Sequence, residues 1–481
     1  MQRKMIQRLL GMLLMAFSGT MLPPFIISFM YADGQATHFL FSLTITLGCG
    51  LGMWLPVRHL VLELHIRDGF IIVTLFWSVL GMFSAVPFLF SPHLDFTDAV
   101  FESVSGFTTT GATVITGLDQ LPPSILYYRQ QLQWLGGMGI IVLAVAIFPM
   151  LGVGGMQLYR AETPGPMKDE KLTPRIANTA RALWFIYMGL TIACALAFWL
   201  AGMSPFDAIN HSFSTVATGG FSTHDASLAY FDSVIIETIA SVFMLLGSIN
   251  FAVHFLAWRE RTLRFYWLDT EVIAFLVIVA ALTLITGAVL WLSNYYPAPL
   301  IALRYAAFQV ISMITTTGFT TANFADWPDL LPIMLIYICF IGGCAGSTAG
   351  GMKVIRVLLL LKQALREIIQ LIHPRGVVSI KVGGRPVKPA VINAVWGFFA
   401  LYVFSTAVLT WLMVGTGLDV LSAYSAVATC LNVTGPGLGV VATSFAAVSD
   451  TGKWLAVFTM LLGRLEVFTL LVLITPAFWQ R

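Results

Sequence analysis

The segment "FTTTGAT", Phe107–Thr113, interrupts strongly apolar sequence with three threonines and a glycine. Three related segments follow: "VATGGFST" at Val216–Thr223, "TTTGFTT" at Thr315–Thr321 and "NVTGPG" at Asn432–Gly437. A Thr-Gly pair is common to all four segments, and its glycines are Gly111, Gly219, Gly318 and Gly435, separated by 108, 99 and 117 residues. Nearly constant spacing of a motif indicates an internal repeat.

The composition is that of a membrane protein. The chain has 481 residues, of which 58% are hydrophobic and 10% charged, and its mean hydropathy is +0.86. Soluble domains carry about 25% charged residues, so this chain has too little polar surface for a water-soluble globule. A spanning helix needs about 20 mostly apolar residues, and we count about ten such segments. The five cysteines have no C-x-x-C spacing, which argues against a disulfide framework and a zinc site.

Charge patterning sets the orientation in the membrane. Most lysines and arginines lie in alternate loops and near the two chain ends, which the positive-inside rule places in the cytoplasm. The opposite loops carry acids, and a surface of one sign concentrates the opposite ion, so the outer face should attract cations. Four basic residues break the pattern: Arg129, Arg304, Lys453 and Arg464.

Each repeat has the same plan: a long apolar helix, a shorter amphipathic helix, the Thr-Gly segment, a second long helix and a basic loop. This plan predicts an all-α integral membrane fold with four tandem helix–pore loop–helix repeats around one pore, plus two extra N-terminal transmembrane helices. No cleavable signal peptide is evident, so the first apolar segment is interpreted as a retained helix. The predicted units are 1–69 for the two extra helices and a cytoplasmic loop, then 70–181, 182–270, 271–390 and 391–481 for repeats 1 to 4. Ten spans place both termini in the cytoplasm.

The Thr-Gly segments suit a selectivity filter. Irregular backbone at membrane depth is tolerated where it lines a cavity or is buried in protein. Four such strands around one axis would offer rings of oxygen that replace the hydration shell of a monovalent cation, and the C-terminal ends of the preceding short helices would stabilise it further. The predicted ion-binding residues are Thr109, Thr110, Gly111, Ala217, Thr218, Gly219, Thr316, Thr317, Gly318, Val433, Thr434 and Gly435.

A second unusual segment is "GGCAGSTAGG", Gly342–Gly351, within the second long helix of repeat 3. Each glycine costs about 1 kcal/mol inside a helix, so this helix should break just below the filter and leave a loop that obstructs the pore. The residues of this predicted gate are Gly342, Gly343, Gly346, Gly350 and Gly351, with Lys353 at the cytoplasmic mouth. The alternative is close helix packing through small residues.

Arg464 lies within the last helix, where an ionisable residue is a functional candidate. A cation there would oppose ion passage or compete with the ion. The alternative is a local pairing with Glu466 or with backbone carbonyls.

These motifs together resemble a known family. The four filter segments, "GGCAGSTAGGMK", the "GRLEVFTLL" of the last helix and the two extra N-terminal helices are similar to the membrane subunits of bacterial Trk potassium transporters (TrkH/TrkG) in the Trk/Ktr/HKT superfamily. The resemblance implies potassium uptake across the bacterial inner membrane, a homodimer with one pore per protomer, and a cytosolic nucleotide-binding regulatory subunit resembling TrkA. It also implies gating by Gly342–Gly351 and Arg464, and potassium selectivity from four filter glycines. One departure is Ala217, which replaces a threonine of the other segments.

We therefore predict potassium uptake by channel-like permeation, driven at least by the membrane potential, which supplies about 2.3 kcal/mol per charge per 100 mV. The alternative within the same fold is a proton- or sodium-coupled symporter. A receptor or scaffold, or a membrane enzyme, would leave four filter-like loops unexplained. We expect K⁺ as the transported ion, no cofactor in this chain, contact with membrane lipid and no nucleic-acid partner.

Overall fold

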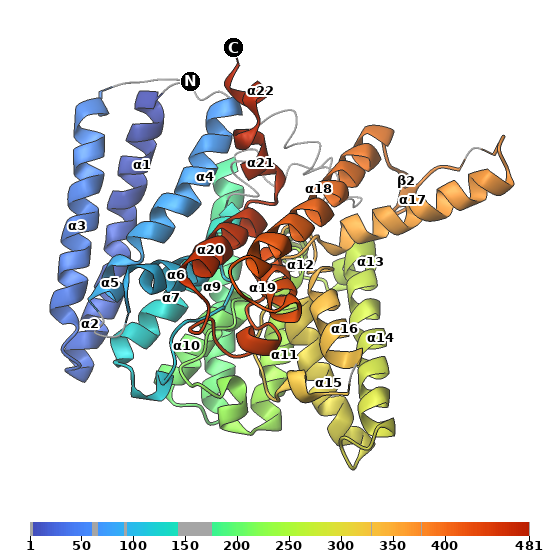
Figure 1. The fold of residues 1–481 in the computed structure, drawn as a ribbon, viewed down its shortest axis with the longest axis horizontal. Coiled ribbons are helices and arrows are strands. Elements are labelled where there is room, and N and C mark those ends of the chain that lie inside the picture. Colours follow the sequence, from blue (N-terminus) through green and yellow to red (C-terminus); the bar gives the residue numbers. More distant parts are fainter. Residues whose placement is uncertain are drawn as a thin grey trace.

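The computed structural model describes residues 3–59, 66–90, 94–142, 176–328, 330–376 and 378–480. Helices dominate these residues, and one antiparallel hairpin joins β1 (Lys381–Val382) to β2 (Arg385–Pro386). The all-α prediction is confirmed. The extra N-terminal helices are α1 (Arg3–Ser18), continued by α2 (Leu22–Tyr31), and α3 (Ala36–Trp54), which stand together at one edge of the molecule (Figure 1).

Four groups of helices follow in chain order. The first contains α4 (Ile66–Phe83), α5 (Val86–Leu89), α6 (Phe96–Phe107) and α7 (Pro123–Val142). The second contains α9 (Ile176–Leu200), α10 (Pro205–Val216), α11 (Val234–Ser248) and α12 (Phe251–Arg259). The third contains α13 (Arg264–Leu268), α14 (Thr270–Leu292), α15 (Pro299–Ile314), α16 (Leu330–Cys339) and α17 (Val354–Ile372). The fourth contains α18 (Pro389–Val414), α19 (Val420–Asn432), α20 (Asp450–Arg464), α21 (Phe468–Ile474) and α22 (Pro476–Trp479).

Four short helices, α6, α10, α15 and α19, precede the Thr-Gly segments, and we call them the pore helices. Three of them begin at a side chain that accepts a hydrogen bond from a free backbone N–H of the first turn: Asp95, Ser204 and Asp419. The fourth, α15, begins with Pro299, whose fixed φ suits a first helical position. Each pore helix therefore has a sharply defined start.

The count of uninterrupted spans differs from the ten expected. Within the described residues, six helices are long and apolar enough to cross a membrane, or eight if each of two bent pairs forms one span. The bent pairs are α11 with α12, at 95°, and α20 with α21, at 113°. The remaining second helices fall short because α7 carries Arg129 and several glutamines, and because α16 stops at Cys339. The expected continuation of α7 to residue 156 and the following basic loop, through residue 175, lie outside the described residues.

Glycines let second helices touch the pore helices backbone to backbone. A Cβ atom added to Gly136 of α7 would lie 1.9 Å from the carbonyl oxygen of Phe107, and one on Gly463 of α20 would lie 2.0 Å from that of Leu431. Phe107 and Leu431 are the corresponding fourth residues before Gly111 and Gly435. The second helices thus hold the ends of the pore helices at their closest possible approach.

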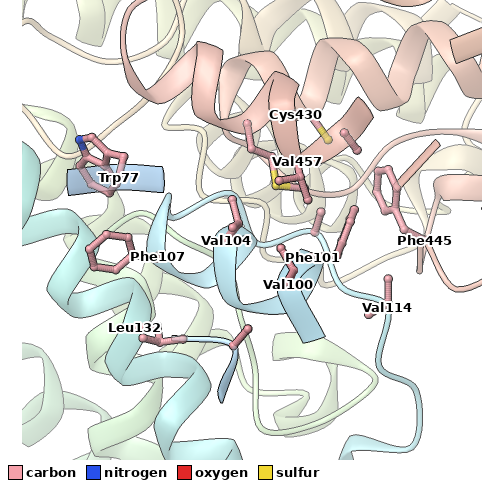
Figure 2. Packing of buried hydrophobic residues seen from close by; sticks show 14 of the residues in the cluster. Trp77, Val100, Phe101, Val104, Phe107, Val114, Leu132, Cys430, Phe445 and Val457 are labelled. Atoms are coloured by element: carbon pink, nitrogen blue, oxygen red, sulfur yellow. The ribbon is translucent and has the colours of Figure 1, made fainter. Parts of the chain in front are cut away.

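Apolar side chains join the first and fourth repeats around these contacts. Figure 2 shows Val100, Phe101 and Val104 of α6 packed against Cys430, Phe445 and Val457 of the fourth repeat. On the other side, the Phe107 ring lies 4.9 Å, centre to centre, from that of Trp77. The first and last repeats therefore share one core, which closes the circle of repeats.

The close approach at Gly136 predicts a specific sensitivity. Gly136→Ala should lower the stability of the protein by about 1–3 kcal/mol, the usual range for overpacking a tight site. The measurement is thermal unfolding of the detergent-purified protein. Gly189→Ala in α9 is the matched control, because nothing lies within 4 Å of its Cβ position. Equal unfolding temperatures for the two variants would contradict this packing argument.

Candidate functional site

The four Thr-Gly segments meet in a closed ring. A Cβ atom built on the glycine of one repeat would lie within 2.8 Å of a carbonyl oxygen of the next repeat. The pairs, glycine first, are Gly111 with Gly219 (2.1 Å), Gly220 with Thr317 (2.0 Å), Gly318 with Thr434 (1.9 Å) and Gly435 with Thr110 (2.8 Å). The contacts run from repeat 1 to 2, 2 to 3, 3 to 4 and 4 back to 1. Any side chain at these glycines would push a neighbouring carbonyl away.

The backbone has the same unusual conformation in all four segments. A residue with left-handed φ stands two positions before a left-handed glycine: Thr109 (58°) and Gly111 (79°), Thr218 (51°) and Gly220 (80°), Thr316 (55°) and Gly318 (83°), Val433 (61°) and Gly435 (96°). A β-branched residue with positive φ is a true outlier. Such strain persists only where surrounding structure enforces it, and it clusters at functional sites.

This conformation corrects the register of the second segment. The glycine equivalent to Gly111, Gly318 and Gly435 is Gly220, whereas the Thr-Gly spacing had aligned Gly219 with them; Gly219 contributes its carbonyl to the ring. The same shift appears in the hydrogen bonds of the residue before each ring glycine, whose N–H donates five residues back: Thr110 to Ser105, Gly219 to Ser214, Thr317 to Ser312 and Thr434 to Thr429. Ala217 is therefore the residue that caps the C-terminal end of α10, and the second filter segment is Thr218–Gly220. The "TGG" sequence contains two glycines that could occupy the position of Gly111, and only the backbone conformation distinguishes them.

The other predicted filter residues are brought together as a unit. Gly111 lies against Gly219 of repeat 2, and the carbonyl of Thr110 lies against Gly435 of repeat 4. Thr316–Gly318 and Val433–Gly435 take the corresponding places in repeats 3 and 4. All of the predicted threonines are buried. In repeats 1 and 3 the hydroxyl of the last threonine, next to the ring glycine, pairs with the hydroxyl two residues earlier: Thr110 with Thr108 and Thr317 with Thr315, each at 2.8 Å.

A buried ion pair supports the first segment from behind. Arg129 of α7 lies 2.7 Å from Glu102 of α6, and both side chains are fully buried. Glu102 accepts a hydrogen bond from the N–H of Val114, and Arg129 donates to the carbonyl of Ser222 in repeat 2. Because breaking a buried ion pair leaves an uncompensated charge, this pair locks the outer ends of two filter segments together. Sequence reasoning missed it, although Glu102 and Arg129 are charges inside membrane segments, which is itself a functional signal.

The glycine-rich segment forms an irregular loop against the filter. No helix covers residues 340–353, so the predicted helix break is confirmed; the gating role stays a prediction. Gly342, Gly346 and Gly351 have positive φ, and a Cβ atom on Gly342 would lie 2.2 Å from the carbonyl of Gly350. The loop is thus folded tightly on itself. The same constraint holds at Gly343, whose Cβ position is 2.6 Å from Ala349.

Hydrogen bonds tie this loop to two filter segments. The N–H of Gly350 donates to the hydroxyl of Thr316 at 2.6 Å, and the hydroxyls of Thr348 and Thr218 lie 3.2 Å apart. On its far side the carboxylate of Glu271 accepts from the N–H groups of Ala345 (2.8 Å) and Ile355 (3.2 Å). Glu271 is a loop-anchoring residue that the sequence motifs did not predict, although an acid at the start of an apolar helix is a candidate for such a role.

The two predicted cations of the gate lie beside the loop. The buried Arg464 donates hydrogen bonds to the carbonyls of Thr348 (3.3 Å) and Gly136 (2.8 Å). Its pairing is therefore with backbone carbonyls, while Glu466 lies 2.8 Å from Arg356. Lys353 is buried and donates to the carbonyl of Ala349 within the loop.

The other exceptions to the charge pattern are also paired. Arg304 of α15 bonds Glu237 through two nitrogens at 2.7 Å, and Lys453 of α20 lies 2.6 Å from Asp98 of α6. With Arg129 and Arg464, all four exceptions join different repeats. They hold the fold together rather than mark its orientation.

A polar cluster links the loops that follow two of the Thr-Gly segments. His224 lies 2.5 Å from the carboxylate of Asp119 and 3.5 Å from that of Asp207. Burial opposes the charged imidazolium, but the two carboxylates outweigh it and hold the pKa of His224 above its usual range. The hydrogen bond from His224 lowers the pKa of Asp119. This cluster joins the loops that follow the first and second filter segments.

Comparisons with known proteins agree with this architecture. The model of the TrkH family, described as cation transport protein, matches residues 36–481. The chain belongs to the TrkH family. The protein named Trk system potassium uptake protein TrkH of Vibrio parahaemolyticus is 56% identical, that of Escherichia coli K12 is 53% identical, and each alignment covers all of both chains. The protein named TrkG of E. coli K12 is 41% identical over 99% of both chains. The solved structure titled potassium transporter TrkH from V. parahaemolyticus superimposes with a TM-score of 0.93 at 53% identity over the whole of both chains.

Membership in the TrkH family confirms the resemblance inferred from the motifs. This TrkH-family chain is an all-helical integral membrane protein with several spanning helices. Its family consists of transport proteins, so the expectation of a transporter rather than an enzyme is confirmed.

The ring predicts the effect of a filter substitution. Gly318→Ser should reduce discrimination between potassium and sodium at least about fivefold, since its Cβ would lie 1.9 Å from the Thr434 carbonyl and displace it. The measurement is the ratio of the two ion permeabilities in proteoliposomes. Gly117→Ser is the control, because Gly117 shares the positive φ but has open space around its Cβ position. An unchanged ratio in a folded Gly318→Ser protein would contradict the assignment of the ring as the filter.

Proposed function

We propose that this protein mediates potassium uptake across the bacterial inner membrane by channel-like permeation through the four-segment ring. One observation carries the proposal: four strained segments present backbone carbonyls to one another in a closed circle. Rings of backbone carbonyls replace the hydration shell of K⁺ in potassium filters. The relatives named above as potassium uptake proteins support the same ion.

The loop Gly342–Gly351 and Arg464 form the proposed gate. The support is geometric, because the loop bonds Thr218 through Thr348 and bonds Thr316 directly, and Arg464 donates to the loop carbonyl of Thr348. A guanidinium beside an ion path repels a passing cation. Conduction therefore requires the loop and Arg464 to move together.

Orientation and assembly complete the proposal. Both chain ends lie on the same side of the molecule (Figure 1), as an even number of crossings requires, and the basic loops favour the cytoplasm for that side. A homodimer is supported by α17, which extends from the body and exposes Leu361, Leu365 and Leu371. The basic cytoplasmic loops offer a surface for a nucleotide-binding regulatory subunit resembling TrkA.

The function is tested by uptake of rubidium-86 into proteoliposomes that hold the purified protein and are loaded with potassium. Uptake should be blocked by external potassium and hardly by sodium. Equal competition by the two ions would overturn the potassium assignment. Varying the proton or sodium gradient at a fixed membrane potential distinguishes permeation from symport, because only a symporter's flux would follow the proton or sodium gradient.

Removing the proposed barrier should raise flux. Arg464→Ala loses two hydrogen bonds from a charged group, each contributing about 1.5–3 kcal/mol, so rubidium flux should rise at least about tenfold. The control is Arg259→Ala, which removes an exposed arginine paired with its neighbour Glu260. Equal or lower flux in a folded Arg464→Ala protein would count against its part in the gate.

A further inference from the structure

The second filter segment lacks the side-chain supports that stiffen the segments of repeats 1 and 3. Its two residues at the places of the paired threonines are Ala217 and Gly219, so the hydroxyl pair of repeats 1 and 3 is missing. A serine hydroxyl that supports the segments of repeats 1 and 3 is also without its bond in repeat 2. Ser105 and Ser312 donate hydrogen bonds to the carbonyls that follow their ring glycines, whereas the hydroxyl of the equivalent Ser214 has no hydrogen-bond partner.

Gln133 of α7 occupies the vacated space. A Cβ atom on Gly219 would lie 2.4 Å from the amide carbon of Gln133, so a side chain at one position excludes the other. The Gln133 amide nitrogen donates to the carbonyl of Gly219 at 2.6 Å, and its oxygen accepts from the N–H of Phe221 at 3.1 Å. These two bonds flank Gly220, and Gln133 is fully buried.

We propose that Gln133 is a positioning residue of the filter, which sets the place of the Gly219 carbonyl and thereby the discrimination between K⁺ and Na⁺. The proposal rests on the proposed function and extends it to a residue of another repeat. The Gly219 carbonyl belongs to the ring, since it lies against Gly111. Gln133 holds this carbonyl in place of the paired threonine hydroxyls of repeats 1 and 3.

The first test is Gln133→Met, which keeps the side-chain volume and removes both hydrogen bonds. Rubidium uptake in proteoliposomes should lose about fivefold in its preference for potassium over sodium competition, the change that one ordinary hydrogen bond brings to an equilibrium. The control is Gln131→Met on the same helix. Gln131 is also buried and donates to a backbone carbonyl, that of Thr20, but away from the filter. Its loss should leave the ion preference unchanged.

The second test exchanges Gln133 for a threonine at Gly219, the position that is threonine in the other three segments. Gly219→Thr alone should impair folding or flux, because the new side chain collides with Gln133. Gly219 has no positive φ, so the double variant Gln133→Ala with Gly219→Thr relieves the collision and gives repeat 2 a threonine like Thr434. It should recover potassium preference relative to Gln133→Ala.

The outcomes separate the two hypotheses. A wild-type protein without potassium preference overturns the proposed function itself. A selective wild type with an equally selective Gln133→Met protein overturns the positioning role and reduces Gln133 to a space-filling residue. If Gln133→Met does not fold, the double variant decides. If it does not improve on Gln133→Ala, either in potassium preference or in yield of folded protein, a threonine at Gly219 cannot replace Gln133 and the positioning role is overturned.

Discussion

The structure depends on four carbonyls held against four glycines. Each contact leaves no room for a Cβ atom at Gly111, Gly220 or Gly318, and the ring closes only if all four segments adopt the same left-handed turn. That turn is costly for threonine and valine, so the remainder of the fold must enforce it. Capped pore helices fix where each segment begins, and the glycines of α7 and α20 bring the second helices against the ends of the pore helices.

The enforcement uses buried charge as well as packing. Glu102 with Arg129 joins the filter segments of repeats 1 and 2, and Lys453 with Asp98 joins repeats 4 and 1. Buried pairs are poor sources of stability but strong sources of specificity where they fix a register. Here they bridge repeats whose apolar surfaces alone would allow sliding. These ion pairs account for the basic residues in segments where the positive-inside rule predicts none.

Much of this arrangement was predictable from the sequence. The repeats, the pore helices and the helix break follow from local patterns: spacing, capping residues and glycine content. The register of repeat 2 was not predictable, because "TGG" contains two glycines that could match Gly111. Only the left-handed backbone of Thr218 shows that the match is Gly220. Nor were the loop anchor Glu271 and the contact of Gln133 with Gly219 predictable, since each joins residues far apart in the chain. Such long-range contacts leave only a weak signal in the sequence, which here is the presence of polar residues in apolar helices.

The proposed gate loop is hydrogen-bonded to two segments of the proposed filter. Thr316 accepts the N–H of Gly350, and Thr218 lies beside Thr348. Any movement that clears the loop from the path must break both contacts, so the two segments lose support when the loop departs. Among the described residues, the segments of repeats 1 and 4 make no hydrogen bond to the loop, although a Cβ atom on Gly350 would lie 2.1 Å from the carbonyl oxygen of Asn432. Loop movement therefore acts unequally on the four repeats, and the symmetry of the ring is broken by the loop that underlies it.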